Sequence, residues 1–347
     1  MKFGTIALID ALGFKGIWSE RRGGPAKAKA MLRAVQKALE TEREWAEAHW
    51  RQITKGERVP EFARSIEFTT HFMSDTAAIA AAAELPAGWE NDKDPHSWTR
   101  TLSGSTMYMI CRALPPALRA AALAETSVAY RGAIACGEMD LAKDFTVGPA
   151  VDDAATGMEA ADGAFVWLMP SALAFCRRLQ SWQWAHVWER TVEFPVSLSG
   201  RAFRTQVVNP FIFQDAPPEP GTIDSLEAAI LGSFRSDDLG VQIKRQNTAR
   251  FLSRARAWVS TTSVAVEHER AQLVAALVEH SLAGAAKAWA TAERKRRVQA
   301  DQPIPARFPG TEADAVALVA EAKVQVDPTA LWKEAFRLWV ENLPAVP

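Results

Sequence analysis

Apolar and polar positions alternate with two different periods in the first part of the chain. Phe3–Ile9 is a short apolar run rich in β-forming residues, and it predicts a buried strand that ends at Asp10. The segment from about Pro25 to Ile53 places apolar residues on one face and begins with a proline, which suits a first helical turn. We therefore expect a strand followed by a long helix.

Two more apolar runs follow with only two residues between them. Ser65–Met73 and Thr76–Ala83 have the pattern of strands, and Ser74 and Asp75 join them. Aspartate tolerates the backbone conformations that tight turns require. This pattern predicts a hairpin with a carboxylate at its tip.

The remaining pattern mixes helices and strands up to about residue 215 and is mostly helical after about residue 222. The elements expected are a helix from about Ser97 to Glu125 that bends near Pro115-Pro116, a strand over Val128–Gly137, a hairpin or loop over Asp140–Gly148, a helix after Pro149, a strand over Ala164–Met169, a helix from Pro170, and a last hairpin over Val192–Phe213. This order predicts an α/β fold of the α+β type, with helices on one face of a mainly antiparallel sheet. We expect a first domain over residues 1–215 and a helical C-terminal extension over 222–347.

Composition narrows the class of protein. The chain has 347 residues and a formal net charge of −1, which gives no sign of nucleic-acid binding. Cys111, Cys136 and Cys176 lack the spacing of a metal site or a redox pair, so we expect buried free thiols in a reducing compartment. No signal peptide opens the sequence, and no apolar run is long enough to span a bilayer. We therefore expect a cytoplasmic protein with no membrane partner.

Asp10 and Asp75 are the candidate chemical groups. Their strands lie side by side in a ferredoxin-like sheet, where the two carboxylates can converge. Convergent carboxylates bind Mg²⁺ or Mn²⁺, and two such ions can activate an attacking oxygen and neutralise a triphosphate. Gly13 permits a tight turn whose backbone N–H groups could receive phosphate oxygens. Each aspartate alone is more often a structural turn residue, and the pair favours a metal site.

Four segments resemble, in order and spacing, the motifs of class III adenylate and guanylate cyclases. Asp10–Phe14 resembles their metal motif, and Ser74-Asp75 resembles the hairpin that supplies a second metal ligand. Tyr130–Glu138 resembles a later strand with an arginine and two glycines, and Gly148–Ala155 resembles the start of a helix. The resemblance implies a ferredoxin-like catalytic core over about residues 1–215.

The positions that read a purine in those enzymes differ here. His71 stands where adenylate cyclases carry a lysine, and Phe145 stands where they carry an aspartate, with Asp144 one position away. Asp152 replaces an asparagine, and Thr156 replaces an arginine that stabilises the transition state. The metal-binding set is therefore kept while the purine-reading set is absent.

This combination, with the helical C-terminal extension, resembles the Pycsar pyrimidine cyclases of bacterial anti-phage defence. The resemblance implies conversion of UTP, or alternatively CTP, into a 3′,5′-cyclic nucleotide and pyrophosphate, with two Mg²⁺ or Mn²⁺ ions per site. The cyclic nucleotide would activate a separate effector protein. The resemblance also implies a homodimer with its sites at the subunit interface.

Within such a site, the resemblance divides the residues between two protomers. One protomer would bind the metals through Asp10, Asp75 and the backbone carbonyl of Ala11. The other would contact base, ribose or phosphate through groups between Ala135 and Thr156. The candidate substrate contacts are Gly13, Phe14, His71, Phe145 and Asp152.

The missing arginine leaves the developing negative charge without a partner. Arg131, Lys143 and Lys15 are the candidate cations. Arg131 could instead make a structural ion pair, and each lysine could simply be solvated. His71 is either a core histidine or a base contact.

Two other functions stay open at this point. A catalytically inactive cyclase-like module that binds a nucleotide or acts as a scaffold would account for Asp152 and Thr156. An adenylate or guanylate cyclase with an unconventional base pocket is the third possibility.

Overall fold

The structure, a computed structural model, describes residues 2–12, 24–53, 65–88, 95–142, 145–176, 187–198, 201–213, 218–219 and 221–259. The chain divides into two compact units, residues 1–259 and 260–347. All described residues belong to the first unit, so most of the expected C-terminal extension lies outside them. The first unit mixes helices with a mostly antiparallel sheet, which confirms the predicted α+β class.

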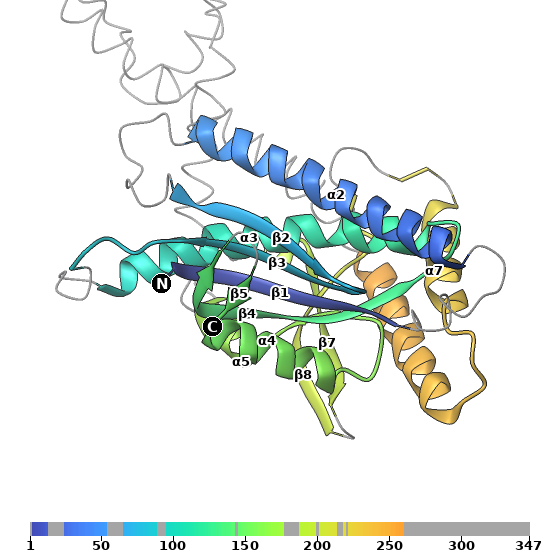
Figure 1. Cartoon of the computed structure of the whole chain (residues 1–347). Coiled ribbons are helices and arrows are strands. Elements are labelled where there is room, and N and C mark those ends of the chain that lie inside the picture. The colour runs from blue at the N-terminus through green and yellow to red at the C-terminus, as the bar shows by residue number, and fades with distance from the viewer. Residues whose placement is uncertain are drawn as a thin grey trace, which may run out of the picture. The chain divides into compact units, whose positions relative to one another are not determined.

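Within the described residues, eight strands form one sheet (Figure 1). Their order is β2-β3-β1-β4-β6-β8-β7, with β5 paired to β4 off this path. The pair β4–β6 is parallel, and the other pairs are antiparallel. The strands are β1 (Lys2–Leu12), β2 (Glu67–Met73), β3 (Thr76–Ala83), β4 (Ala129–Leu141), β5 (Thr146–Val147), β6 (Val166–Leu168), β7 (Thr191–Leu198) and β8 (Arg201–Val208).

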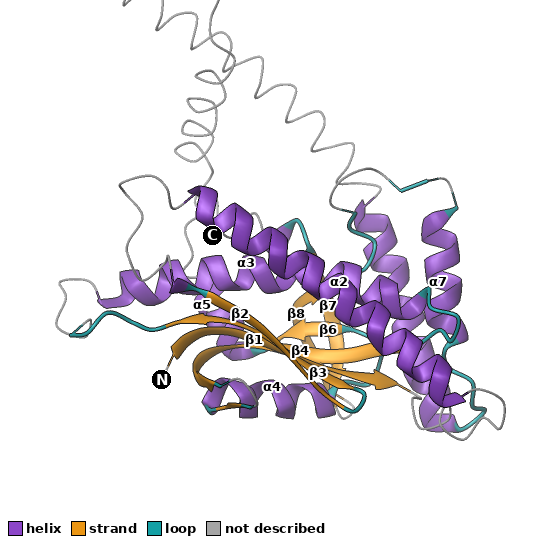
Figure 2. Ribbon diagram, turned by 45° about the horizontal axis from the view of Figure 1, so that its top comes forward, coloured by secondary structure: helices purple, strands orange, loops and turns teal. Residues whose placement is uncertain are grey.

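Helices pack against both faces of this sheet (Figure 2). The helices are α2 (Gly24–Ile53), α3 (Pro95–Ala122), α4 (Pro149–Ala160), α5 (Pro170–Cys176), α7 (Thr222–Gly232) and a helix over 239–259. One core cluster joins α2, α3 and α5 to one face of the sheet, and a second joins α4, α7 and 239–259 to the other face. Among the described helices, none has the length and apolar character needed to cross a membrane.

The prediction that helices cover only one face is therefore wrong. The central strand β1 is apolar on both faces, because Ala7 and Ile9 lie in the first cluster while Ile6 and Leu8 lie in the second. A strand that is apolar on both faces needs a covering layer on each side. The continuous apolar run of β1 thus indicates a covering layer on each face, and not burial alone.

Individual elements agree closely with the sequence pattern. The hairpins β2–β3 and β7–β8 and the starts of α4 and α5 lie where expected. One detail differs from the expectation. Strand β1 continues to Leu12, so Asp10 lies inside the strand rather than after it. Helix α3 is a single helix that contains Pro115 and Pro116.

The beginning of the expected C-terminal extension shares the core of the sheet. Leu226 and Ile230 of α7 and Phe251 of the 239–259 helix are buried with Phe165, next to β6. The rings of Phe165 and Phe251 lie 6.1 Å apart in an edge-to-face arrangement. Residues 222–259 thus pack within the first compact unit.

Candidate functional site

Asp10, Thr76 and Arg131 form a row across three neighbouring strands. Asp10 of β1 lies opposite Thr76 of β3 and opposite Arg131 of β4. Directly opposed residues in antiparallel strands point to the same face of a sheet. The three side chains therefore meet on the face that α4 covers, and we call them the carboxylate row.

Both oxygens of the Asp10 carboxylate have a partner in this row. The Thr76 hydroxyl donates to Oδ1 at 3.0 Å, and Nη2 of Arg131 donates to Oδ2 at 3.3 Å. The Asp10 and Arg131 side chains are each about one-fifth exposed. Nε of Arg131 is buried and has no hydrogen-bond partner. The guanidinium is thus only partly satisfied by Asp10.

Asp75 lies beside this row because of the β2–β3 hairpin. Met73 pairs with Thr76, so Ser74 and Asp75 form a two-residue turn, as the sequence predicted. Ser74 has φ of 61°, a left-handed conformation that costs a serine about 1–2 kcal/mol. Asp75 directly precedes Thr76, which contacts Asp10. The two candidate metal ligands therefore lie at the same end of the sheet.

Tyr130 approaches both carboxylates from the other face of the sheet. It lies opposite Ala11 in the β1–β4 ladder, and its hydroxyl lies 3.9 Å from the sulfur of Met31 in α2. Burial, followed by the negative charges of Asp75 and Asp10, raises the pKa of the Tyr130 phenol. Tyr130 therefore stays protonated at neutral pH.

His71 and Thr69 of β2 lie on the same face as the carboxylate row. Their partners in the β2–β3 ladder are Ala78 and Ala80, whose side chains belong to the core cluster on the α4 side. Nε2 of His71 and Oγ1 of Thr69 are buried without hydrogen-bond partners. Buried polar atoms of this kind normally find a partner, so a ligand that supplies one is a direct explanation.

The second group of predicted contacts lies far from Asp10 within one chain. Strand β4 starts near Asp10 and ends at Leu141, and β5 pairs with that distant end. The nine steps from Arg131 to Asp140 span about 30 Å in an extended strand. Phe145, which is 51% exposed, precedes β5. The structure does not bring Phe145 together with Asp10.

The start of α4 lies at this distant end as well. Gly148 precedes the helix with φ of 134°, and a Cβ there would lie 2.9 Å from the Cα of Met139. Asp152 is exposed in the first turn, and the hydroxyl of Thr156 donates to the Asp152 carbonyl. Asp152, in the first turn of α4, therefore lies toward the same end of β4 as Phe145. Thr156, by contrast, precedes Gly157, which packs against Ala133 of β4.

Several predicted site residues lie outside the described residues, namely Gly13, Phe14, Lys15, Lys143 and Asp144. Ala11 is described: its side chain is buried in the core, and its backbone pairs with Tyr130. Sequence reasoning missed Thr76 as a neighbour of Asp10. The hairpin register could have revealed it, because a two-residue turn fixes which residues of β2 and β3 are opposite.

The donor set fits a divalent cation. Two carboxylates and a threonine hydroxyl supply the hard oxygen atoms that Mg²⁺ and Mn²⁺ prefer. In the part of the chain that the structure describes, no group of three or more His, Cys, Asp or Glu side chains is placed to hold a metal.

No protein-family model and no curated protein sequence matches this chain.

Proposed function

We propose that this protein is a nucleotidyl cyclase of the class III type. It converts a pyrimidine nucleoside triphosphate, UTP in preference to CTP, into a 3′,5′-cyclic nucleotide and pyrophosphate. The observation that carries the proposal is the carboxylate row, with Asp75 at the tip of the adjoining hairpin. A carboxylate in contact with a guanidinium, with a second carboxylate at the same end of the sheet, matches what a metal-bound triphosphate requires.

The reaction is an in-line displacement at the α-phosphorus. The bond from the ribose 3′ oxygen to the α-phosphorus forms, the bond from that phosphorus to the leaving pyrophosphate oxygen breaks, and the hydroxyl proton passes to solvent. Divalent ions held by Asp10 and Asp75 would supply positive charge against the triphosphate. The chain itself positions the triphosphate and contributes a fixed cation.

Arg131 is a cation in direct contact with Asp10, one of the two proposed metal ligands. Its ion pair with Asp10 leaves Nε without a partner, so a phosphate oxygen can satisfy the guanidinium better than one carboxylate oxygen does. This role would replace the arginine that the sequence lacks at Thr156. Lys143 and Lys15 lie outside the described residues and stay candidates from the sequence alone.

Thr69 and His71 support recognition of the substrate through a small base. Oγ1 of Thr69 and Nε2 of His71 are buried without hydrogen-bond partners, next to the buried side chains of Ala78 and Ala80. The two polar atoms can pair with the edge of a pyrimidine. We take this arrangement as support for a base contact at His71.

The separation of the two residue groups supports a homodimeric site. Asp10 and Asp75 of one protomer would face Phe145 and Asp152 of its partner, because a single chain keeps these groups about 30 Å apart along β4. The role in anti-phage defence, the cytoplasmic location and the separate effector protein rest on the family resemblance alone.

A turnover assay tests this function. Purified protein with Mn²⁺ receives ATP, GTP, CTP and UTP separately, and mass spectrometry identifies the products. We expect a cyclic pyrimidine nucleotide from the native chain, none after addition of a chelator, and none from Asp10→Ala or Asp75→Ala. Asp237→Ala, which removes an exposed carboxylate elsewhere, should keep full turnover. A cyclic purine product would support an adenylate or guanylate cyclase instead.

A catalytically inactive nucleotide-binding or scaffolding module is the second candidate. It is favoured by the hydroxyl of Thr156, which donates to a carbonyl of its own helix where the related enzymes carry a catalytic arginine. Nucleotide binding without any product, by a chain whose circular dichroism shows that it is folded, would support this candidate.

A further inference from the structure

The outer face of α2 carries charge in an unusual order. Its first half contains Lys27, Lys29, Arg33 and Lys37 and no acidic residue, whereas its second half contains Glu40, Glu42, Glu44 and Glu47. A helix dipole favours the opposite order, with acidic residues near the N-terminus. Intrahelical pairs also prefer glutamate on the N-terminal side of lysine. Helix stability therefore does not explain this order.

The charges lie on the side of α2 that faces away from the core. Ala28, Met31, Val35 and Leu39 are buried against the sheet and α3. At 100° per residue, Arg33, Lys37, Glu40 and Glu44 lie on the opposite side of the helix. Arg33, Lys37 and Glu44 are exposed, and the Glu40 side chain is 47% exposed. We call these four residues the α2 charge stripe.

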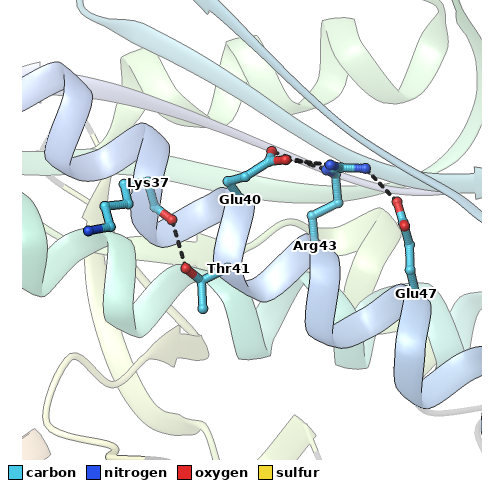
Figure 3. Close-up of polar contacts among 5 residues, drawn as sticks. All are labelled: Lys37, Glu40, Thr41, Arg43 and Glu47. Atoms are coloured by element: carbon cyan, nitrogen blue, oxygen red, sulfur yellow. Dashed lines mark hydrogen bonds and ion pairs between the residues drawn. The ribbon is translucent and has the colours of Figure 1, made fainter.

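The acidic half is held in place by Arg43. Its guanidinium donates to Glu40 on one side and to Glu47 on the other, at 2.5 Å (Figure 3). The hydrogen bond from Arg43 lowers the pKa of Glu40, which keeps that carboxylate ionised. Three carboxylates (Glu40, Glu44 and Glu47) against one guanidinium leave a net charge of −2, while Lys29, Arg33 and Lys37 give +3.

This stripe is complementary to itself when two copies of α2 lie antiparallel. In two antiparallel helices, the residue numbers of each opposed pair have the same sum. If Lys37 of one copy lies opposite Glu40 of the second, Arg33 therefore lies opposite Glu44. A two-fold axis repeats both contacts, so four opposite-charge pairs form and no like-charge pair falls within the stripe. Exposed Ala26 and Ala30 on the same side allow the helices to approach.

We propose that the α2 charge stripe is a docking surface for the α2 helix of a second copy of this chain. The inference does not rest on the proposed activity. The contact through α2 lies on one face of the sheet. The proposed shared site with Phe145 and Asp152 would form on the other face, which α4 covers. Two different two-fold contacts on one chain build assemblies of dimers, so docking through α2 would join dimers into larger species.

The test compares the mass of the full-length chain in solution at two salt concentrations. Sedimentation velocity at about 0.1 M salt should give an assembly at least twice the mass found at about 1 M salt, because screening shortens the reach of exposed charges from about 10 Å to about 3 Å. An unchanged mass between the two concentrations would overturn the proposal.

Charge reversal assigns the contact to the stripe. Variant A carries Arg33→Glu and Lys37→Glu, and variant B carries Glu40→Lys and Glu44→Lys. Each alone should lose the low-salt assembly, because every pair in the stripe becomes a like-charge pair. An equimolar mixture of A and B should regain it, because each A–B contact again has four opposite-charge pairs. Circular dichroism checks that both variants are folded.

The control variant carries Arg245→Glu and Arg250→Glu, the same change in charge as variant A on exposed arginines of the 239–259 helix. It should assemble like the native chain. The proposal is wrong if A and B retain the native assembly, if their mixture fails to restore it, or if the control variant loses it as well.

Discussion

The Asp10 carboxylate accepts hydrogen bonds from two side chains. A metal ion bound to Asp10 would have to displace them or bind beside them. Thr76 donates to one oxygen and Arg131 to the other. The Arg131 guanidinium compensates the Asp10 charge, so a metal ion at Asp10 would compete with it. Metal binding and release of Arg131 are therefore coupled in this account, and the coupling can be measured without turnover.

Replacement of Arg131 by methionine should strengthen the binding of Mn²⁺. Removing a competing positive charge beside Asp10 is expected to raise the affinity roughly fivefold to tenfold, about 1 kcal/mol, at a partly exposed site. Isothermal titration of Mn²⁺ into nucleotide-free protein measures this change, and Asp10→Asn should weaken the same binding. The control is Arg204→Met, at an exposed arginine of β8. Weaker binding by Arg131→Met would show that the guanidinium does not compete with the metal.

Replacement of Ser74 by valine should destabilise the protein. A β-branched residue fits the left-handed backbone at φ of 61° worse than serine does, so the free energy of unfolding should fall by about 1–2 kcal/mol. Urea denaturation measures the loss. The neighbouring change Met73→Val, at a side chain that is 63% exposed, should have almost no effect. Equal losses for the two variants would contradict a strained turn at Ser74.

At the scale of elements, α4 is held against the sheet by a glycine. A Cβ added at Gly157 would lie 2.2 Å from the sulfur of Met169 and 2.8 Å from the Cβ of Ala133 in β4. The Trp167 indole N–H also donates to the Gly157 carbonyl at 3.1 Å. These contacts fix the distance between α4 and strands β4 and β6.

The change Gly157→Ala should therefore cost stability even though alanine favours helices. Overpacking of this kind costs about 1–3 kcal/mol. The matched control is Gly232→Ala in α7, where an added Cβ would meet no atom within 4 Å, and it should be neutral or slightly stabilising. Thermal or urea unfolding compares the two. Stabilisation by Gly157→Ala would show that α4 is less tightly packed than described.

The sequence predicted local elements better than their arrangement. The two-residue turn at Ser74 and Asp75 fixed both the β2–β3 hairpin and its register, because turn chemistry is local. The consecutive apolar residues Ile6, Ala7, Leu8 and Ile9 indicate that helices cover both faces of the sheet. One apolar run does not show which helix covers which face. The contact of Arg131 with Asp10 needed the pairing of β1 with β4, which depends on residues about 120 positions apart.

At the scale of the whole molecule, the three cysteines are buried free thiols, as expected from the sequence. Burial raises the pKa of Cys111 to about 12 and that of Cys136 to about 12. The folded state thus holds these thiols protonated over a range in which the unfolded chain releases the protons. Their contribution to stability is full below about pH 9 and is lost as the pH rises toward 12.

The free energy of unfolding should therefore decline between about pH 9 and pH 12. Each thiol contributes up to about 1.4 kcal/mol per pH unit to this decline. Urea denaturation of the native chain and of Cys111→Ala over this range isolates one thiol, and the curve of the variant should be flatter. Parallel curves would contradict a raised pKa at Cys111.

The most direct test of the central claim is the identity of the product that the native chain makes from UTP and from CTP with Mn²⁺. The account predicts a cyclic pyrimidine nucleotide together with an equal amount of pyrophosphate, and no product when both Asp10 and Asp75 are changed to alanine. The account is contradicted if the folded native chain releases inorganic phosphate or a linear nucleotide, or if the double variant forms the cyclic product at the native rate.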